Sequence, residues 1–182
     1  MILSLWDGLV ADSGLKDRLQ AVFDEFRLID RSTFYWYPRV LEGAAAPGNP
    51  IEELAELVIA KVQPGRLAGV EYWTNSLDTG EHMHLHHDKD ERLFWQTREL
   101  RHPLIGTVYY PDRIAFTGGE LVIDGKHLVS TGPNQLAAFR GNLTHGVQKV
   151  KSGIRQSIAL NLWAETPMAY GEVVSHENAP AK

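Results

Sequence analysis

The sequence has no cysteine, no long hydrophobic run and no excess of basic residues. Its 182 residues include 18 Lys and Arg against 23 Asp and Glu, which gives a formal net charge of −5. Without thiols, the chain holds neither a disulfide scaffold nor a zinc site built on cysteine. The basic residues are scattered, so nothing indicates a surface for a nucleic-acid backbone. No apolar run approaches the roughly 20 residues that cross a bilayer.

What remains is the composition of one globular domain, with 43% hydrophobic residues. We expect a single domain over 1–182, made of helical support over 1–64, a β-rich core over 65–165 and a polar tail over 166–182. The first residues lack the basic segment and the small-residue cleavage site of a secretory signal. We therefore expect a cytoplasmic protein that does not associate with a membrane, and the oligomeric state stays open.

Two amphipathic helices are predicted in the first third. Residues 15–29 carry apolar side chains at nearly helical spacing, with Asp12 or Ser13 as the N-cap. A second helix is predicted to begin at Pro50 and to continue to Val62, after a loop rich in glycine and proline. We expect both helices to support the β-rich part from outside.

From residue 65 onward, short runs rich in β-branched and aromatic residues alternate with turn residues, a pattern typical of a β-sandwich or barrel. Strands are predicted near 67–74, 82–88, 92–97, 103–110, 119–124, 126–130, 135–139, 143–149 and 155–163. Helices followed by strands indicate an α+β, mainly β fold in which helices support one outer face of a jelly roll. Residues 34–37, Trp73 and Trp95 are interpreted as packing, with Tyr35, Trp36 and Trp95 as alternative substrate contacts.

Four of the eight histidines lie within residues 82–87. On a strand, alternate residues share a face, so His86 and Asp88 offer an imidazole and a carboxylate side by side. A third ligand must come from elsewhere, and His145 lies in a strand-like run late enough to pair back across a barrel. Two histidines and one carboxylate form the facial arrangement of non-haem iron(II) oxygenases. The alternative interpretation is a solvated, histidine-rich strand edge.

Arg155 follows ten residues after His145, and a turn is predicted between them at residues 151–153. If that turn closes a hairpin, Arg155, Ser157 and Asn161 share the inward face with His145. A buried arginine needs an anionic partner, and its planar fork matches a carboxylate. That partner is either a protein carboxylate or a dicarboxylate ligand that also chelates the metal.

Taken in order, these residues resemble the 2-oxoglutarate- and iron(II)-dependent oxygenases, and specifically their prolyl 4-hydroxylase-like branch. The resemblance covers roughly residues 70–165. It rests on an ordered set of elements: His86-x-Asp88, Thr107-Val108-Tyr109-Tyr110, the run from Phe116 to Leu121, the run from Pro133 to Phe139, His145-Gly146-Val147, Gly153-x-Arg155-x-Ser157 and Trp163.

The resemblance implies a double-stranded β-helix, a cupin-like jelly roll, that binds Fe(II), 2-oxoglutarate and O2. In this family, oxidative decarboxylation of 2-oxoglutarate to succinate and CO2 accompanies hydroxylation of a substrate. The implied metal ligands are His86, Asp88 and His145, and the implied contacts of the distal 2-oxoglutarate carboxylate are Arg155, Tyr110 and Ser157.

Some positions depart from the family. Asn161 stands where some relatives carry an inward tryptophan, and its amide is a candidate partner for the iron-bound carboxylate or for a substrate. His84, Asn161 and Trp95 are therefore candidate contacts of the substrate or of the metal ligands. Met83 occupies a position at which several members carry a tyrosine.

Two other functions compete with an oxygenase. The first is a non-catalytic, cupin-type protein that binds a metal or a small molecule, although Arg155 would then have no purpose. The second is a zinc metallohydrolase, although Asp88 follows the histidines instead of preceding the last of them.

The chain leaves little room for a dedicated peptide- or nucleic-acid-binding domain, so we expect a small molecule or an exposed peptide segment as substrate. The candidate specificity loops are 78–81, 89–98 and 112–117.

Overall fold

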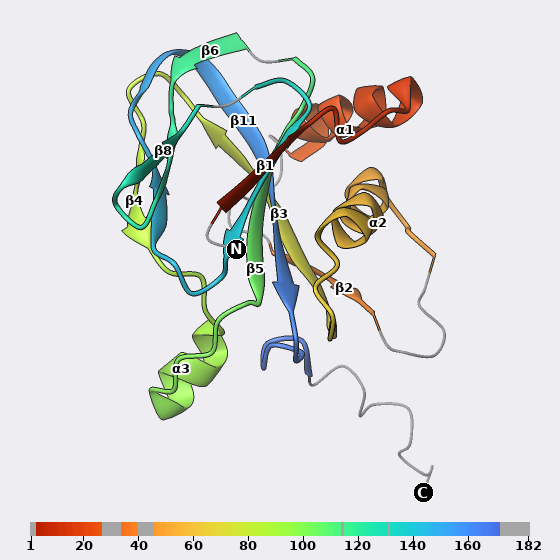
Figure 1. Ribbon diagram of the computed structural model, residues 1–182, viewed down its shortest axis with the longest axis vertical. Helices are drawn as coiled ribbons and strands as arrows, with labels where there is room; N and C mark the ends of the chain where they lie inside the picture. Colours follow the sequence, from red (N-terminus) through yellow and green to blue (C-terminus); the bar gives the residue numbers. More distant parts are fainter. Residues whose placement is uncertain (1–2, 27–33, 40–45, 114, 131, 172–182) are drawn as a thin grey trace, which may run out of the picture.

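The protein is described here by a computed structural model that covers residues 3–26, 34–39, 46–113, 115–130 and 132–171. Two antiparallel β-sheets face each other, and two helices cover the outer side of the larger sheet (Figure 1). Within those ranges, no helix is both long enough and apolar enough to span a bilayer.

The larger sheet contains seven strands. They are β1 (Leu3–Asp7), β2 (Tyr35–Pro38), β3 (Gly69–Leu77), β5 (Ile105–Tyr110), β6 (Ala115–Gly118), β9 (Gln135–Arg140) and β11 (Val150–Trp163). The smaller sheet consists of β4 (Met83–His86), β7 (Leu121–Ile123), β8 (His127–Val129) and β10 (His145–Val147). The strand orders are β1-β9-β5-β11-β3-β2, with β6 beside β11, and β4-β10-β7-β8.

Helices α1 (Ser13–Phe26) and α2 (Pro50–Val62) begin where the sequence predicts. The Asp12 carboxylate accepts a hydrogen bond from the backbone N–H of Leu15 at 2.7 Å, which makes Asp12 the N-cap of α1. Asn49 caps α2, and Pro50 occupies its first turn, where no backbone N–H is needed. Residues 27–29 of the first predicted helix, and the tail beyond residue 171, lie outside the described residues.

The long strand β11 separates two environments. Ile158, Leu160 and Leu162 belong to the apolar core shared with α1 and α2. The alternate side chains, such as Arg155 and Asn161, line a cavity between the two sheets. Because successive residues of a strand point to opposite faces, one strand builds both the helix-supported core and the cavity wall. Strand β3, next to β11 in the sheet, divides its residues in the same way.

Several predicted elements were wrong. Residues 92–97 were predicted as a strand but form α3 (Glu91–Thr97), because the Asp90 carboxylate accepts from the backbone N–H of Leu93 and caps a helix. Residues 115–118, predicted as a loop, form β6. The segment expected to give only helical support also contributes two strands of the larger sheet, β1 and β2.

The predicted hairpin between His145 and Arg155 is also wrong. Strand β10 pairs with β4 and β7, whereas β11 pairs with β6, β3 and β5. The chain therefore crosses from the smaller to the larger sheet between the two residues. His145 and Arg155 still line one cavity, because the two sheets face each other across it.

Candidate functional site

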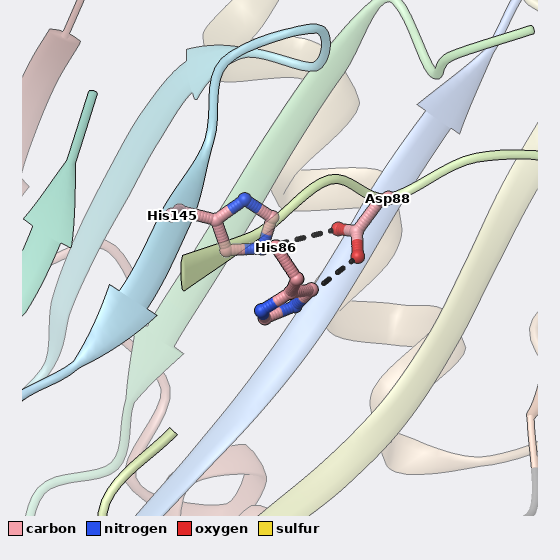
Figure 2. Close-up of side chains that lie close together, drawn as sticks. All are labelled: His86, Asp88 and His145. Atoms are coloured by element: carbon pink, nitrogen blue, oxygen red, sulfur yellow. Dashed lines mark ion pairs between the residues drawn. The ribbon is translucent and has the colours of Figure 1, made fainter. Parts of the chain in front are cut away.

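His86, Asp88 and His145 meet between the two sheets, as the sequence predicts (Figure 2). His86 ends β4 and His145 begins β10, and the register of these antiparallel strands places the two histidines opposite each other. Asp88 follows β4 and turns its carboxylate toward both rings. His86 Nε2 lies 3.6 Å from Asp88 Oδ1, and His145 Nε2 lies 3.4 Å from Asp88 Oδ2.

Backbone carbonyls orient both imidazoles. The Nδ1 atom of His86 lies 2.9 Å from the carbonyl oxygen of His84, and Nδ1 of His145 lies 3.3 Å from that of Leu143. A carbonyl oxygen only accepts, so Nδ1 of each ring carries a proton, and Nε2 is turned toward the site. This is the arrangement in which neutral histidines bind a metal through Nε2.

Asp88 is held as a carboxylate. Burial acts to raise the pKa of Asp88, but hydrogen bonds with His145 and Asn161 and the nearby imidazoles outweigh burial and lower it. The side-chain amide of Asn161 donates to Asp88 Oδ2 at 3.0 Å, which fixes the orientation of the carboxylate. The pKa of His145 is raised above its ordinary value. Burial acts to lower it, but the hydrogen bond with Asp88 and the charge of Asp88 outweigh burial.

These three side chains fit a divalent transition metal. One ligand atom from each lies within 4.8 Å of the others. Metal–ligand bonds of roughly 2.1 Å at right angles place neighbouring ligand atoms about 3 Å apart, close to the separations found here. Two histidines and one carboxylate are the protein ligands of non-haem iron(II) sites, so His86, Asp88 and His145 would hold such an ion.

Arg155 lies in the same cavity and is buried, with 1% of its surface exposed. Its guanidinium donates from Nε to the carbonyl oxygen of Gly119 at 2.9 Å, and from its two terminal nitrogens to Ser157 Oγ at 3.0 Å and to Tyr110 Oη at 2.6 Å. All three acceptors are neutral. Among the described residues, no carboxylate pairs with this charge.

The guanidinium of Arg155 keeps unused N–H donors on both of its terminal nitrogens. A guanidinium has five N–H groups, and the three hydrogen bonds leave one N–H on each terminal nitrogen. Burial raises the pKa of Tyr110 even though the charge of Arg155 opposes the rise, so the phenol keeps its proton. Gly119 makes room for this group, because a Cβ at that position would lie 2.9 Å from Arg155 Cδ.

The cavity that joins these groups has a volume of about 490 Å³. Toward β3 it is lined by Glu71, Trp73 and Phe34, none of which the sequence singled out as site residues. Phe34 and Trp73 had been interpreted as packing, but their rings lie 5.0 Å apart at the cavity and Phe34 is half exposed. The signal that could have found them is the alternation of Glu71, Trp73 and Asn75 along one face of a strand.

Glu71 is a partly buried carboxyl group that lines the cavity. Its two oxygens accept hydrogen bonds from Tyr170 Oη at 3.0 Å and Trp163 Nε1 at 3.2 Å. Burial raises the pKa of Glu71 from its ordinary value of 4.5 to about 7. Asp88 adds to the rise through its charge, and the hydrogen bonds oppose it.

Two predicted site residues lie elsewhere. Trp95 is 69% exposed on α3 and does not line the cavity, and its ring contacts the guanidinium of Arg98 instead. The side chain of His84 is also outside the cavity lining and contacts His82, with Nε2 atoms 3.3 Å apart. Only the backbone carbonyl of His84 contributes to the site, through His86.

No protein-family model and no curated protein matches the sequence, whereas many solved structures match the fold. A Pseudomonas putida prolyl-4-hydroxylase aligns with a TM-score of 0.64 and 16% identity, covering 90% of this chain and 93% of its own. A viral collagen prolyl hydroxylase from Paramecium bursaria Chlorella virus-1, solved with 2-oxoglutarate, aligns at 0.60 and 16%, covering 91% and 97%.

HygX from Streptomyces hygroscopicus, solved with nickel and 2-oxoglutarate, aligns with a TM-score of 0.54 and 15% identity, covering 88% of this chain and 81% of its own. At these identities the likeness concerns the fold. The α+β, mainly β architecture expected from the sequence is confirmed, and the chain has the double-stranded β-helix fold of the prolyl hydroxylases and 2-oxoglutarate oxygenases.

Proposed function

We propose that this protein is a 2-oxoglutarate- and iron(II)-dependent dioxygenase that hydroxylates a C–H bond of a small molecule or of an exposed peptide segment. In the balanced reaction, one O2 and one 2-oxoglutarate give succinate, CO2 and one hydroxyl group on the substrate. The metal ligands in this proposal are His86, Asp88 and His145.

The observation that carries the proposal is the unpaired charge of Arg155. An isolated buried guanidinium is costly, and the neutral acceptors around it leave the charge uncompensated. A carboxylate that accepts the two remaining N–H groups would compensate the charge and satisfy the fork. Because Arg155 and the His86–Asp88–His145 group line one cavity, a ligand with two carboxylates fits both ends.

Each part of the chain has a separate task. Arg155 binds the distal carboxylate of 2-oxoglutarate, Ser157 orients the guanidinium, and Tyr110 has a phenolic proton free to donate to the same carboxylate. Apolar side chains such as Val108, Leu121 and Phe139 line the cavity between them and exclude water. When bound, Fe(II) supplies the redox chemistry that uses O2. The protein positions the reactants and excludes water from the cavity.

The competing functions have less support. Across the described parts of the chain, His86, Asp88 and His145 are the one three-residue group of metal-binding side chains, and the other histidines of the cluster do not join it. A two-metal hydrolase site therefore lacks ligands. A cupin-type binding protein without catalysis would need the metal group but not the donor fork of Arg155.

The test is formation of succinate from 2-oxoglutarate by the iron-loaded protein, with a panel of amines, amino acids and peptides as candidate substrates. His145→Gln removes a proposed ligand, and His84→Gln is a matched control two residues from His86 whose side chain lies outside the cavity. We expect wild type and His84→Gln to produce succinate only with Fe(II), and His145→Gln to fall to background.

Two results would reject the proposal. If the protein binds 2-oxoglutarate and metal but forms no iron-dependent succinate with any panel member, it is a non-catalytic binding protein. If zinc supports hydrolysis of esters or amides while iron supports no succinate formation, it is a metallohydrolase.

A further inference from the structure

Glu71 presents a second uncompensated charge, opposite in sign to Arg155, in the same cavity. Its two hydrogen-bond donors, Tyr170 and Trp163, are neutral. No Lys, Arg or His of the described chain forms an ion pair with Glu71. A carboxyl group in this position either takes up a proton, as its raised pKa of about 7 indicates, or keeps its charge beside a cationic ligand.

Three other charged side chains of the cavity lining, Lys89, Asp90 and Glu91, take part in ion pairs. Lys89 Nζ donates to Glu91 at 2.6 Å, and Asp90 is paired with Arg101. These pairs do not neutralise Glu71. Among the described residues, Glu71 therefore receives hydrogen bonds but forms no ion pair.

Two aromatic rings line the same cavity as Glu71. Trp73 lies two residues along β3 and lines the cavity from the same face of the strand, and Phe34 packs against it with ring centroids 5.0 Å apart. The π-face of tryptophan attracts cations as well as apolar groups. A carboxylate followed by two aromatic rings is suited to a ligand with a positive charge at one end and an apolar body.

We propose that the primary substrate is an amine, bound as the ammonium ion by Glu71, with its apolar body against Trp73 and Phe34. This inference rests on the proposed function and names the class of substrate for that site. The two charges in the cavity then select different ligands: Arg155 attracts the dicarboxylate, and Glu71 repels it and attracts the cation. The two molecules cannot exchange places without opposing like charges.

A purely structural role for Glu71 predicts different behaviour. Tyr170 stacks on Trp36 with centroids 5.2 Å apart and donates its hydroxyl to Glu71, so Glu71 also helps to hold the turn around residue 170. Tyr170→Phe removes this hydrogen bond and keeps the carboxylate. Glu71→Gln keeps the shape of the side chain and removes the charge. Tyr170→Phe therefore tests whether Glu71 acts by holding the turn, and Glu71→Gln tests whether it acts by binding a cation.

The experiment measures binding of phenethylammonium and of its neutral analogue 2-phenylethanol to the protein loaded with Mn²⁺ and 2-oxoglutarate. Mn²⁺ replaces iron so that no turnover occurs, and relaxation of the probe protons by Mn²⁺ reports binding beside the metal. We expect wild type to prefer the ammonium probe by about tenfold or more, the range of one charge-assisted hydrogen bond. Glu71→Gln should lose the preference, whereas Tyr170→Phe and the surface control Glu99→Gln should keep it.

Several outcomes overturn the inference: equal affinity of wild type for both probes, no measurable binding of the ammonium probe, a preference that survives in Glu71→Gln, or an equal loss in Tyr170→Phe. Affinity for Mn²⁺ and for 2-oxoglutarate is measured in every variant. If Glu71→Gln loses Mn²⁺, Glu71 acts on the metal ligands and the inference fails. If wild type does not bind 2-oxoglutarate, the proposed function fails, and the probe preference still decides the role of Glu71.

Discussion

At the scale of single residues, Arg155 and Glu71 are charges whose partners the described chain does not supply. Arg155 could be singled out from the sequence, because its distance from His145 matches a known arrangement. Glu71 could not, because a glutamate on a strand is ordinarily solvated, and its surroundings come from Trp163 and Tyr170, both about a hundred residues later. The sequence therefore predicts site residues that belong to a recognisable motif, such as Arg155. It does not predict a residue such as Glu71, whose role depends on its surroundings in the folded protein.

The fork of Arg155 leads to a prediction about Arg155→Lys. Lysine keeps the charge but lacks the planar pair of donors that matches a carboxylate. We expect the affinity of the Mn²⁺-loaded protein for 2-oxoglutarate to fall by roughly tenfold to a hundredfold, measured by titration calorimetry. Arg113→Lys, at an exposed ion pair with Asp17, is the control and should bind as wild type does. Unchanged affinity in Arg155→Lys would remove Arg155 from the 2-oxoglutarate site.

The raised pKa of Glu71 leads to a prediction about stability. In the unfolded chain this carboxyl ionises near 4.5, and in the folded protein it ionises at about 7. Between these values the unfolded state binds fewer protons, so Glu71 lowers the free energy of unfolding as the pH rises from 4.5 to 7. The full effect is roughly 3 kcal/mol above pH 7 and is absent below pH 4.5.

Urea unfolding of the metal-free protein at pH 5, 6, 7 and 8 measures this effect. Relative to wild type, Glu71→Gln should gain stability progressively toward pH 8, because glutamine has no charge to bury. Glu99→Gln should follow the wild-type pH dependence. Parallel curves for Glu71→Gln and wild type would show that Glu71 ionises in the folded protein as it does in the unfolded chain.

At the scale of elements, pairing between β4 and β10 brings the two proposed histidine ligands together. The sequence indicated both strands but not their pairing, because the residues that fix the register are distant in the chain. It placed His145 and Arg155 on the same face of one hairpin, whereas the strand of His145 pairs with the strand of His86. The helix α3 was missed because Leu93, Phe94 and Trp95 favour strands, and a single cap decides the outcome in so short a segment.

Gly146 allows the close approach of these two strands. A Cβ at this position would lie 2.7 Å from the carbonyl oxygen of Met83 and 3.0 Å from that of His84. Gly146→Ala must therefore push β4 away, together with the carbonyl that orients His86. We expect a loss of about 1–3 kcal/mol in stability and a fall of about tenfold or more in Mn²⁺ affinity.

Gly171→Ala is the matched control for Gly146→Ala, because no atom lies within 4 Å of the added Cβ. Urea unfolding and a titration with Mn²⁺ measure both variants. If Gly146→Ala binds Mn²⁺ as tightly as Gly171→Ala, close contact between β4 and β10 is not what positions the proposed ligands.

At the scale of the whole molecule, helices support one side of the larger sheet, and the candidate site lies on the other side. Helices α1 and α2 bury the outer face of the sheet in an apolar core, and the inner face, opposite the smaller sheet, carries Arg155 and Asn161 (Figure 1). This division could be predicted in outline, because the helices precede the strands in the sequence and successive side chains of a strand point to opposite faces. The pairing partners of β1, β2 and β6 could not, since edge strands carry little periodic signal.

In the proposed function, one cavity holds a metal and 2-oxoglutarate together: the His86–Asp88–His145 group binds the metal, and Arg155 binds the distal carboxylate. Titration of 2-oxoglutarate into wild-type protein, with and without bound Mn²⁺, tests this arrangement. If the ligand chelates the metal while Arg155 holds its distal carboxylate, Mn²⁺ must tighten 2-oxoglutarate binding, and 2-oxoglutarate must tighten Mn²⁺ binding by the same factor. We predict a factor of at least about ten, and equal affinity with and without Mn²⁺ would contradict the account.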